Sequence, residues 1–420
     1  MKKRRFSVNF DSRETVDQDQ PDASKTIADL PLIDFNDAGY LAEPLPTLAS
    51  YASQWKLGRS SRGLEVLDYD LCREVMVSSK FGTGHPRLMD VIGLPEGPAL
   101  HYKRNSISFH NRGETRRKLR APLNRTLGMK GAQRFRADIK QVVKQTIDEI
   151  PHNKEVNLIT ALCDRIPSRV YCYWLNAPLE DAEFVSRTSH TVQQVHTRNP
   201  EHTKAMTKAF EDLLVYVDTR IEAAIKNPGD DLLSELIQAT EDGQMTHDDL
   251  RNWIVKLAEA NTDNSSHQIA IAVIELASRP ELWASLRKDP SLIPAALREV
   301  MRFHPRSLST SREAMEDVVM DGVLIPKGAA VFANIGAAHW NPDHFPEPEQ
   351  FNIHRPTIPA HLNFGGGSFS CIGRFAVTIE IEEVIAYLTA KYSGLEITRS
   401  EFSHSPMFTS VNTLDVVLKH

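Results

Sequence analysis

The 420-residue chain has only four cysteines and no long apolar run. Cys72, Cys163, Cys172 and Cys371 show neither paired spacing nor the spacing of a metal site, which argues against a disulfide-stapled secreted domain. No stretch is apolar for long enough to cross a membrane, and lysines and arginines rather than an apolar signal core follow Met1. We therefore expect a cytoplasmic protein with no membrane anchor.

The chain also lacks a strong excess of charge, an internal repeat and a low-complexity tract. Its net charge of −6 argues against general nucleic-acid binding, and 41% hydrophobic with 25% charged residues is an ordinary globular composition. Length alone suggests two or three domains, because single cores usually stop growing near about 250–300 residues. Residues 1–28 are polar and mixed in charge, which predicts a mobile N-terminal tail.

Helical periodicity fills most of the chain. It begins at Leu67 to Val77, and an irregular segment rich in glycine and proline follows from Phe81 to Gly113. The next predicted helices span residues 114–127, 132–149, 156–175, 180–196, 201–225, 231–240, 247–278 and a further one from 281. After Pro305 the period shifts towards two, and Asp321-Gly322 predicts a hairpin. The predicted fold class is mainly α with a smaller β region.

Cys371 lies in the most informative segment, the glycine-rich loop of residues 364–373, which reads Phe-Gly-Gly-Gly-Ser-Phe-Ser-Cys-Ile-Gly. A thiolate is a strong electron donor to a metal. Glycines let the backbone close around the sulfur, the following helix N-terminus stabilises its charge, and Phe364 can shield it from water. An inert buried cysteine is the competing interpretation, and the complete spacing disfavours it.

With this loop, the chain resembles the cytochrome P450 family of haem-thiolate monooxygenases. A second shared motif, Glu299-Val300-Met301-Arg302, precedes the loop and places a carboxylate and a guanidinium on one helix face. The resemblance implies the cytochrome P450 fold in a single catalytic domain over residues 29–420. It also implies haem b between an oxygen-binding helix and the cysteine loop.

The resemblance further implies roles for individual residues. Cys371 would be the axial iron ligand, within a loop that includes Phe364, Gly365 and Gly373. Glu299 and Arg302 would form a structural triad with Arg355. The haem propionates would be held by Arg116, Arg120 and Arg312. Phe369 stands where relatives usually have histidine or arginine, a loss that Arg116 can partly offset.

Residues 260–265, Ala-Asn-Thr-Asp-Asn-Ser, align with the family's oxygen-binding helix. Most members have Ala-Gly-x-(Asp/Glu)-Thr-Thr there, and the acid and the first threonine deliver protons. Asp263 keeps the acid, but Asn264 replaces the threonine, and an amide is no hydroxyl relay. Ser265, a water or a substrate hydroxyl can complete the relay. Peroxide-driven or otherwise altered chemistry is a second explanation, and a backbone contact of Asn264 is a third.

The resemblance places His101, Ala260, Leu308 and Phe408 at the substrate pocket. Residues 101–104, His-Tyr-Lys-Arg, would suit a substrate with a carboxylate or several hydroxyls, although an orientation towards solvent is the favoured interpretation. Nine cations crowd residues 112–136. They predict a docking surface for an acidic ferredoxin-type donor, whose reductase would draw on NAD(P)H; a solvated helix face is the alternative.

The predicted function is that of a haem-thiolate monooxygenase. It would use O2 and electrons from a redox partner to hydroxylate or oxidatively dealkylate a small organic substrate. A peroxide-driven or atypical haem-thiolate catalyst of coupling or rearrangement is one alternative, and a non-catalytic haem-binding sensor is another.

Overall fold

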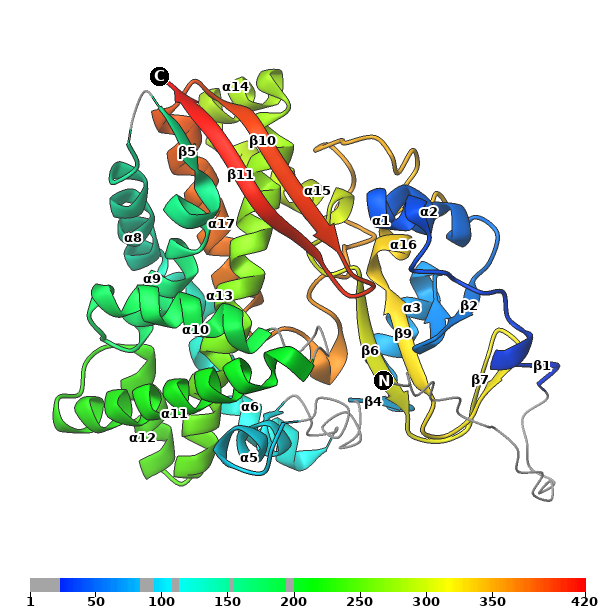
Figure 1. Ribbon diagram of the computed structural model, residues 1–420, viewed down its shortest axis with the longest axis horizontal. Helices are drawn as coiled ribbons and strands as arrows, with labels where there is room; N and C mark the ends of the chain where they lie inside the picture. Colours follow the sequence, from blue (N-terminus) through cyan, green and yellow to red (C-terminus); the bar gives the residue numbers. More distant parts are fainter. Residues whose placement is uncertain (1–22, 84–93, 108–112, 152–153, 194–199) are drawn as a thin grey trace.

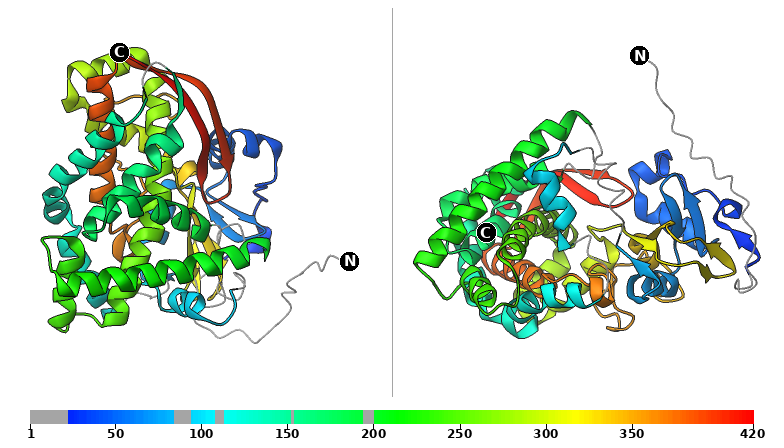
Figure 2. Two further views of the ribbon diagram at one scale, coloured as in Figure 1. Left: turned by 60° about the vertical axis from the view of Figure 1, so that its left-hand side comes forward. Right: turned by 90° about the horizontal axis from the view of Figure 1, so that it is seen from below.

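A computed structural model describes residues 23–83, 94–107, 113–151, 154–193 and 200–420. Helices gather on one side of the molecule and a β-rich part lies on the other (Figures 1 and 2). The predicted mainly α fold with a smaller β region is confirmed.

The long helix α13 (His247–Ala277) forms the axis of the helical part. A capping box begins it, since Thr246 Oγ1 accepts from Asp249 N (3.1 Å) and the Asp249 carboxylate accepts from Thr246 N (2.9 Å). Residues 269–274 are all buried, because other helices cover α13 on most sides. These neighbours are α9 (Arg165–Trp174), α10 (Ala182–Gln193), α11 (Thr203–Lys226), α12 (Leu232–Glu241), α14 (Pro280–Lys288), α15 (Ile293–Phe303) and α17 (Arg374–Lys391).

Four further helices complete this part: α5 (Pro98–Asn105), α6 (Glu114–Thr126), α7 (Met129–Arg134) and α8 (Arg136–Asp148). The long antiparallel hairpin of β10 (Gly394–His404) and β11 (Thr409–Lys419) packs against α13. β5 (Glu155–Asn157) pairs with β11. The hairpin tip reaches the segment after α15, where Leu308 N donates to Met407 O (2.8 Å).

The β-rich part is built on a five-stranded sheet in the order β2-β3-β9-β6-β4. Its strands are β2 (Leu57–Ser60), β3 (Gly63–Val66), β4 (Phe81–Gly82), β6 (Ser309–Ala314) and β9 (Ala330–Asn334). The helices α1 (Ala38–Ala42), α2 (Pro44–Ala52), α3 (Tyr69–Val77) and α16 (Ile335–His339) lie beside it (Figure 1). A smaller sheet joins β1 (Lys25–Thr26), β8 (Val323–Ile325) and β7 (Val318–Met320).

Most predicted helices are present within a residue or two of their expected bounds, and β7 and β8 form the predicted hairpin. Two predictions merged separate elements. The helix expected at 132–149 is divided at Phe135 into α7 and α8. The helix expected at 156–175 begins as β5 and a π-helical turn, Ile159–Cys163, before α9 starts. The last residues of the helix expected at 180–196 lie outside the described residues.

The N-terminal region is more regular than the sequence suggested. Helices α1 and α2 precede residue 67, where helical periodicity was expected to begin, and α5 lies inside the segment expected to be irregular. Lys25 and Thr26 pair with Val323 and Leu324, so the expected tail boundary at residue 28 is wrong for 25–28. Among the described residues, no helix is long and apolar enough to span a membrane.

Candidate functional site

The cysteine loop folds tightly onto itself before α17. Cys371 N donates to Phe364 O (2.8 Å), and Gly365 N donates to Leu362 O (2.8 Å). Gly365 and Gly367 have φ values of +62° and +59°, a region that favours glycine over any residue with a Cβ. The sequence of the loop therefore determines the turn that presents the thiol.

Cys371 is exposed to the two cavities that it lines, and the surrounding chain partly desolvates its sulfur. Burial raises the pKa of its thiol, while the backbone N–H groups of Gly373 and Arg374 and the charge of Arg120 oppose this effect. Such donors and cations favour the thiolate over the thiol. The loop thus presents a sulfur that opens onto a cavity, together with several groups that stabilise its negative charge.

A mainly apolar cavity of about 230 Å³ extends from Cys371 to α13. Phe364 and Val377 line it beside the thiol, and Ala260 and Asn264 line it from α13. A flat apolar group with one metal ion suits these walls, because the single strong donor is a thiol and most of the remaining contact surface is apolar. The residues present fit haem.

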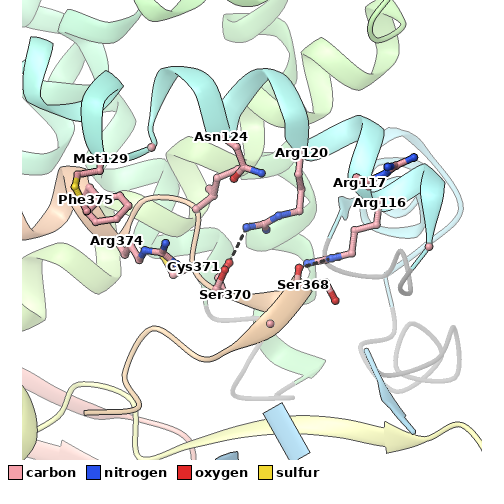
Figure 3. A pocket seen from close by; sticks show the side chains of 14 residues that line it. Arg116, Arg117, Arg120, Asn124, Met129, Ser368, Ser370, Cys371, Arg374 and Phe375 are labelled. Atoms are coloured by element: carbon pink, nitrogen blue, oxygen red, sulfur yellow. Dashed lines mark hydrogen bonds between the residues drawn. The ribbon is translucent and has the colours of Figure 1, made fainter. Parts of the chain in front are cut away.

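A second and more basic cavity, of about 730 Å³, meets the first at Cys371 (Figure 3). Arg116 and Arg120 reach into it from α6, one helical turn apart. Arg116 Nε donates to Ser368 O (2.9 Å) and Arg120 Nη2 donates to Ser370 O (2.7 Å). The structure brings two of the three predicted propionate residues, Arg116 and Arg120, to the cysteine loop, where their guanidinium groups bind backbone carbonyls.

Phe369 lies between two guanidinium groups. Arg116 stands 4.4 Å from the centre of its ring, and Arg312 on β6 stands 4.9 Å from it. Each contact is a cation–π interaction. Phe369 supplies no propionate donor, but it positions both arginines beside the cysteine loop.

The predicted triad residues meet behind the loop. Arg302 and Glu299 form a bidentate pair (2.7 and 2.9 Å), and Arg355 Nε donates to Glu299 Oε1 (3.1 Å). Arg302 Nη1 also donates to the carbonyl oxygens of His339 (3.1 Å) and Pro348 (2.8 Å). Glu299 thus pairs with both arginines, Arg302 also binds backbone carbonyls, and the three residues connect α15 to the segment before the cysteine loop.

Asp263 lies in a buried cluster of ionic contacts. Its Oδ2 accepts from Arg306 (2.7 Å), and its Oδ1 lies 3.1 Å from His190 Nδ1 and 3.5 Å from His267 Nε2. Burial alone would raise the pKa of Asp263, but these partners hold it well below its usual range. Asp263 is therefore an ionised and fully engaged carboxylate.

Histidine 190 links Asp263 to a second carboxylate. Its Nε2 lies 3.2 Å from Asp164 Oδ1. Burial would lower the pKa of His190, but the two carboxylates outweigh burial and raise it to about 10. The imidazole is therefore charged at neutral pH and ties α10 to α13.

Asn264 makes the backbone contact that was one of the predicted explanations for this residue. Its Nδ2 donates to Ala260 O (3.0 Å), one turn earlier in α13. Ser265 Oγ donates to Asn261 Oδ1 (3.2 Å), and both residues line the cavity that contains Cys371. Asp263 does not line that cavity, whereas Ser265 does.

Two of the expected pocket residues lie elsewhere. His101 is exposed and lines neither the Cys371 cavity nor the cavity that adjoins it, and Leu308 is buried in a separate apolar cluster with Tyr40, Leu45 and Leu48. Neither side chain lines the cavity next to Cys371. Ala260 and Phe408 do line the cavity next to Cys371.

The favoured solvent orientation of residues 101–104 holds for only half of them. His101 and Arg104 are exposed, but Tyr102 and Lys103 are buried against α13. Sequence reasoning also missed Arg306, which lines the Cys371 cavity and pairs with Asp263. The sequence contained a signal for this residue. Arg306 directly follows His304-Pro305, where α15 cannot continue, so its side chain had to lie in the segment after the helix.

Comparisons with known proteins agree with this geometry. The family model "Cytochrome P450" matches residues 66–393. Luteothin monooxygenase of Streptomyces thioluteus is 27% identical over 373 residues, which are 88% of this chain and 91% of that protein. Nocardicin C N-oxygenase of Nocardia uniformis subsp. tsuyamanensis is 29% identical over 283 residues, which are 67% of this chain and 70% of that protein.

Solved structures show the same fold. The crystal structure of CalO2 has a TM-score of 0.85 at 20% identity and covers 93% of this chain and 99% of its own. Epothilone D-bound cytochrome P450epoK has a TM-score of 0.84 at 22% identity, with 92% and 99% covered. Together with the family match over most of its length, these findings show that the chain belongs to the cytochrome P450 family of haem-thiolate monooxygenases.

Proposed function

We propose that Cys371 is the thiolate ligand of haem b and that Arg116, Arg120 and Arg312 hold its propionates. The observation that carries this proposal is a single cavity with Cys371 at one wall and Ala260 and Asn264 of α13 at another. Haem bound there would supply the iron that activates O2 with electrons from a partner. The chain's own residues hold the group, shield the thiolate and supply protons.

The substrate would be a small organic molecule that undergoes hydroxylation or oxidative dealkylation. The apolar side chains of Trp174, Leu257 and Phe408 in the wall of the Cys371 cavity support this class. Two electrons would come from a ferredoxin-type donor, reduced in turn by NAD(P)H through a reductase. The basic side chains around the larger cavity support an acidic donor.

The ligand assignment has a direct test. Cys371→Ser should abolish the thiolate signature of the reduced carbonyl complex, because a serine hydroxyl is not ionised at neutral pH. Cys72→Ser is the matched control, since the Cys72 thiol is buried and donates to Val66 O (3.1 Å), a bond that serine can also make. A thiolate signature that survives Cys371→Ser would overturn the assignment.

We further propose that Ser265 supplies the hydroxyl that Asn264 lacks, while Asn264 stabilises the helix through Ala260 O. Ser265 lines the Cys371 cavity, whereas Asp263 is held by Arg306 and the histidines. Ser265 can pass on a proton only while a second donor, such as water or a substrate hydroxyl, reaches it.

Coupling of electrons to product measures this relay. Ser265→Ala should lower the product formed per NAD(P)H about a hundredfold, at the lower end of the range that general acid–base groups contribute, and should raise peroxide release. Thr262→Val is the control, because the buried Thr262 hydroxyl has no hydrogen-bond partner among the described residues. Asn264→Thr should improve coupling, since it adds a hydroxyl at the usual position. Equal coupling in Ser265→Ala and the unmodified protein would rule out the relay.

A peroxide-driven reaction is the second candidate function. It is favoured by the amide of Asn264, which already donates to the helix backbone and is not a hydroxyl. This candidate would be supported if hydrogen peroxide alone gave product as fast as O2 with redox partners does. A protein that binds ligands but consumes no NAD(P)H with active partners would instead be a sensor.

A further inference from the structure

A polar cavity of about 380 Å³ adjoins the cavity that contains Cys371. The two cavities share Ala260, Asn264, Arg306 and Phe408. Of the residues that line the polar cavity, only Ala260 and Phe408 are apolar, whereas small-molecule pockets are usually lined mainly by apolar side chains. The part of a ligand that enters this cavity must therefore be hydrophilic.

Lys256 belongs to a group of side chains with more positive than negative charge. Glu259 on α13 is contacted by the ammonium groups of Lys103 and Lys256, the second at 3.3 Å, and accepts from Tyr102 Oη (2.8 Å). The Glu259 side chain is 3% exposed and that of Lys103 is 7% exposed. One buried carboxylate thus serves two cations, and one positive charge is left without a counterion among these groups.

The pKa values of these groups agree with that imbalance. Burial would raise the pKa of Glu259, but the charges of Lys103 and Lys256 hold it well below its usual range. Burial lowers the pKa of Lys103, Glu259 opposes this, and the charge of Lys256 lowers it further. The two ammonium groups therefore compete for the same carboxylate.

The carboxylate in the cavity wall cannot balance Lys256. Asp263 already binds Arg306 through Oδ2, and its Oδ1 contacts His190 and His267. The distal nitrogen of His190 is in turn bound to Asp164. The positive charges of Arg306 and His190 are thereby balanced by the carboxylates of Asp263 and Asp164. The surplus positive charge therefore lies on Lys256.

Lys256 is also the member of its group that a ligand can reach. It lines the polar cavity, and its side chain is 23% exposed, whereas Lys103 does not line this cavity and is 7% exposed. Lys256, Ala260 and Asn264 follow one another at intervals of four along α13 and so share a face of the helix. The eight residue steps from Lys256 to Asn264 span about 12 Å of helix axis.

We propose that the polar cavity binds the carboxylate of the substrate and that Lys256 is its specificity-determining residue. A surplus of one positive charge suits a monoanion, which favours a carboxylate over a doubly charged phosphate. The rest of the molecule then extends along Ala260 and Asn264 into the Cys371 cavity. The oxidised carbon stands several bonds from the carboxylate. This inference rests on the proposed function, of which it names the substrate class.

The test compares acids with their neutral analogues on the ferric holoprotein. Decanoate, 4-phenylbutanoate and cinnamate, each with its primary amide, are titrated at pH 7 and low salt, with the Soret band and isothermal calorimetry as readouts. At least one carboxylate should bind about tenfold more tightly than its amide, as expected for one charge-assisted hydrogen bond.

Variants of Lys256 separate charge from shape. Lys256→Met keeps the length of the side chain and should reduce carboxylate affinity to that of the amide, with amide affinity unchanged. Lys256→Arg should retain most of the preference, and Lys140→Met, at an exposed site on α8, should leave both affinities unchanged.

Three results would overturn the proposal. One is an amide affinity equal to or above that of every carboxylate. Another is a carboxylate preference that survives Lys256→Met. The third is that the carboxylates at millimolar concentration neither give a heat of binding nor displace imidazole that has been bound to the haem iron. The carbonyl spectrum of each variant reports the thiolate centre separately, so a normal spectrum assigns a failed binding result to this proposal alone. An abnormal spectrum in the unmodified protein would instead refute the proposed function.

Discussion

Glu380 lies on α17, nine residues after Cys371, and its side chain is fully buried. Neither of its carboxyl oxygens forms a hydrogen bond with a described residue. Burial raises its pKa to about 8, and the neighbouring Asn261 amide opposes the shift only in part. Glu380 therefore carries a proton at neutral pH, in contrast to Asp263, whose partners keep it ionised.

This difference predicts how stability changes with pH. Because the pKa of Glu380 is about 4.5 in the unfolded chain and about 8 in the folded one, the protonated group stabilises the fold fully below 4.5. That stability is lost as pH rises through about 8, at up to about 1.4 kcal/mol per pH unit. Glu380→Gln should remove this loss, as measured by urea unfolding of the holoprotein between pH 5 and 8.

The exposed Glu222 on α11 provides the control. Glu222→Gln should leave the pH dependence of the unfolding free energy unchanged, since an exposed carboxylate has similar surroundings in the folded and unfolded chain. An equally steep loss of stability in Glu380→Gln and the unmodified protein would show that another group is responsible.

Connections between elements depend on a few buried charges. Arg302 bonds to Glu299 on its own helix and to the carbonyl oxygens of His339, Pro348 and Gln350, so α15 holds the segment that leads to the cysteine loop. The Arg302 and Glu299 side chains are 3% and 4% exposed. Removing Glu299 leaves Arg302 as an uncompensated buried charge, and removing Arg302 leaves Glu299 with Arg355 as its remaining charged partner.

We therefore expect Arg302→Ala to lower the unfolding free energy by about 3 kcal/mol, the lower end of the range for a broken buried pair, because Arg355 still pairs with Glu299, and to weaken retention of haem. Unfolding in urea and the haem content after gel filtration measure the two effects. Lys208→Ala is the control, because Lys208 and Asp212 form an exposed pair on α11, and such pairs contribute roughly 0.5 kcal/mol or less. Normal stability and haem content in Arg302→Ala would contradict a supporting role for the triad.

Across the whole molecule, charge is distributed unevenly despite the net value of −6. Arginines of α6 surround the larger cavity next to the cysteine loop (Figure 3). Arg117 and Lys118 are 78% and 68% exposed, and Arg116 and Arg120 are turned inwards to the loop. Exposed cations beside the redox centre suit electrostatic docking of an acidic electron donor.

This surface predicts an effect of charge reversal on electron transfer. The double change Arg117→Glu with Lys118→Glu should slow second-order reduction by a ferredoxin about tenfold at low salt, within the range of electrostatic steering. The defect should shrink at high salt, because exposed charges are screened. Stopped-flow reduction measures it. Lys288→Glu with Lys327→Glu, two exposed sites on α14 and after β8, should have little effect. An equal loss in both pairs would exclude a specific docking surface.

The amino-acid sequence by itself determined the features that consecutive residues control. The turn around Cys371 follows from glycines at positive φ, and α13 follows from a capping box and a long helical period. The same local patterns wrongly predicted α7 and α8 as one helix. They also failed to predict β5, whose partner is the distant strand β11. A strand of three residues is stabilised by its pairing rather than by its own propensity.

Only the tertiary structure decided which ionisable groups meet. Lys103 and Glu259 are 156 positions apart and His190 and Asp263 are 73 apart, yet each pair is in contact. The Lys103 prediction was wrong for this reason, since a short polar run does not reveal a buried carboxylate on another helix. Charge states in the interior depend on burial and on neighbours brought together by packing, and helical period and loop sequence contain neither quantity.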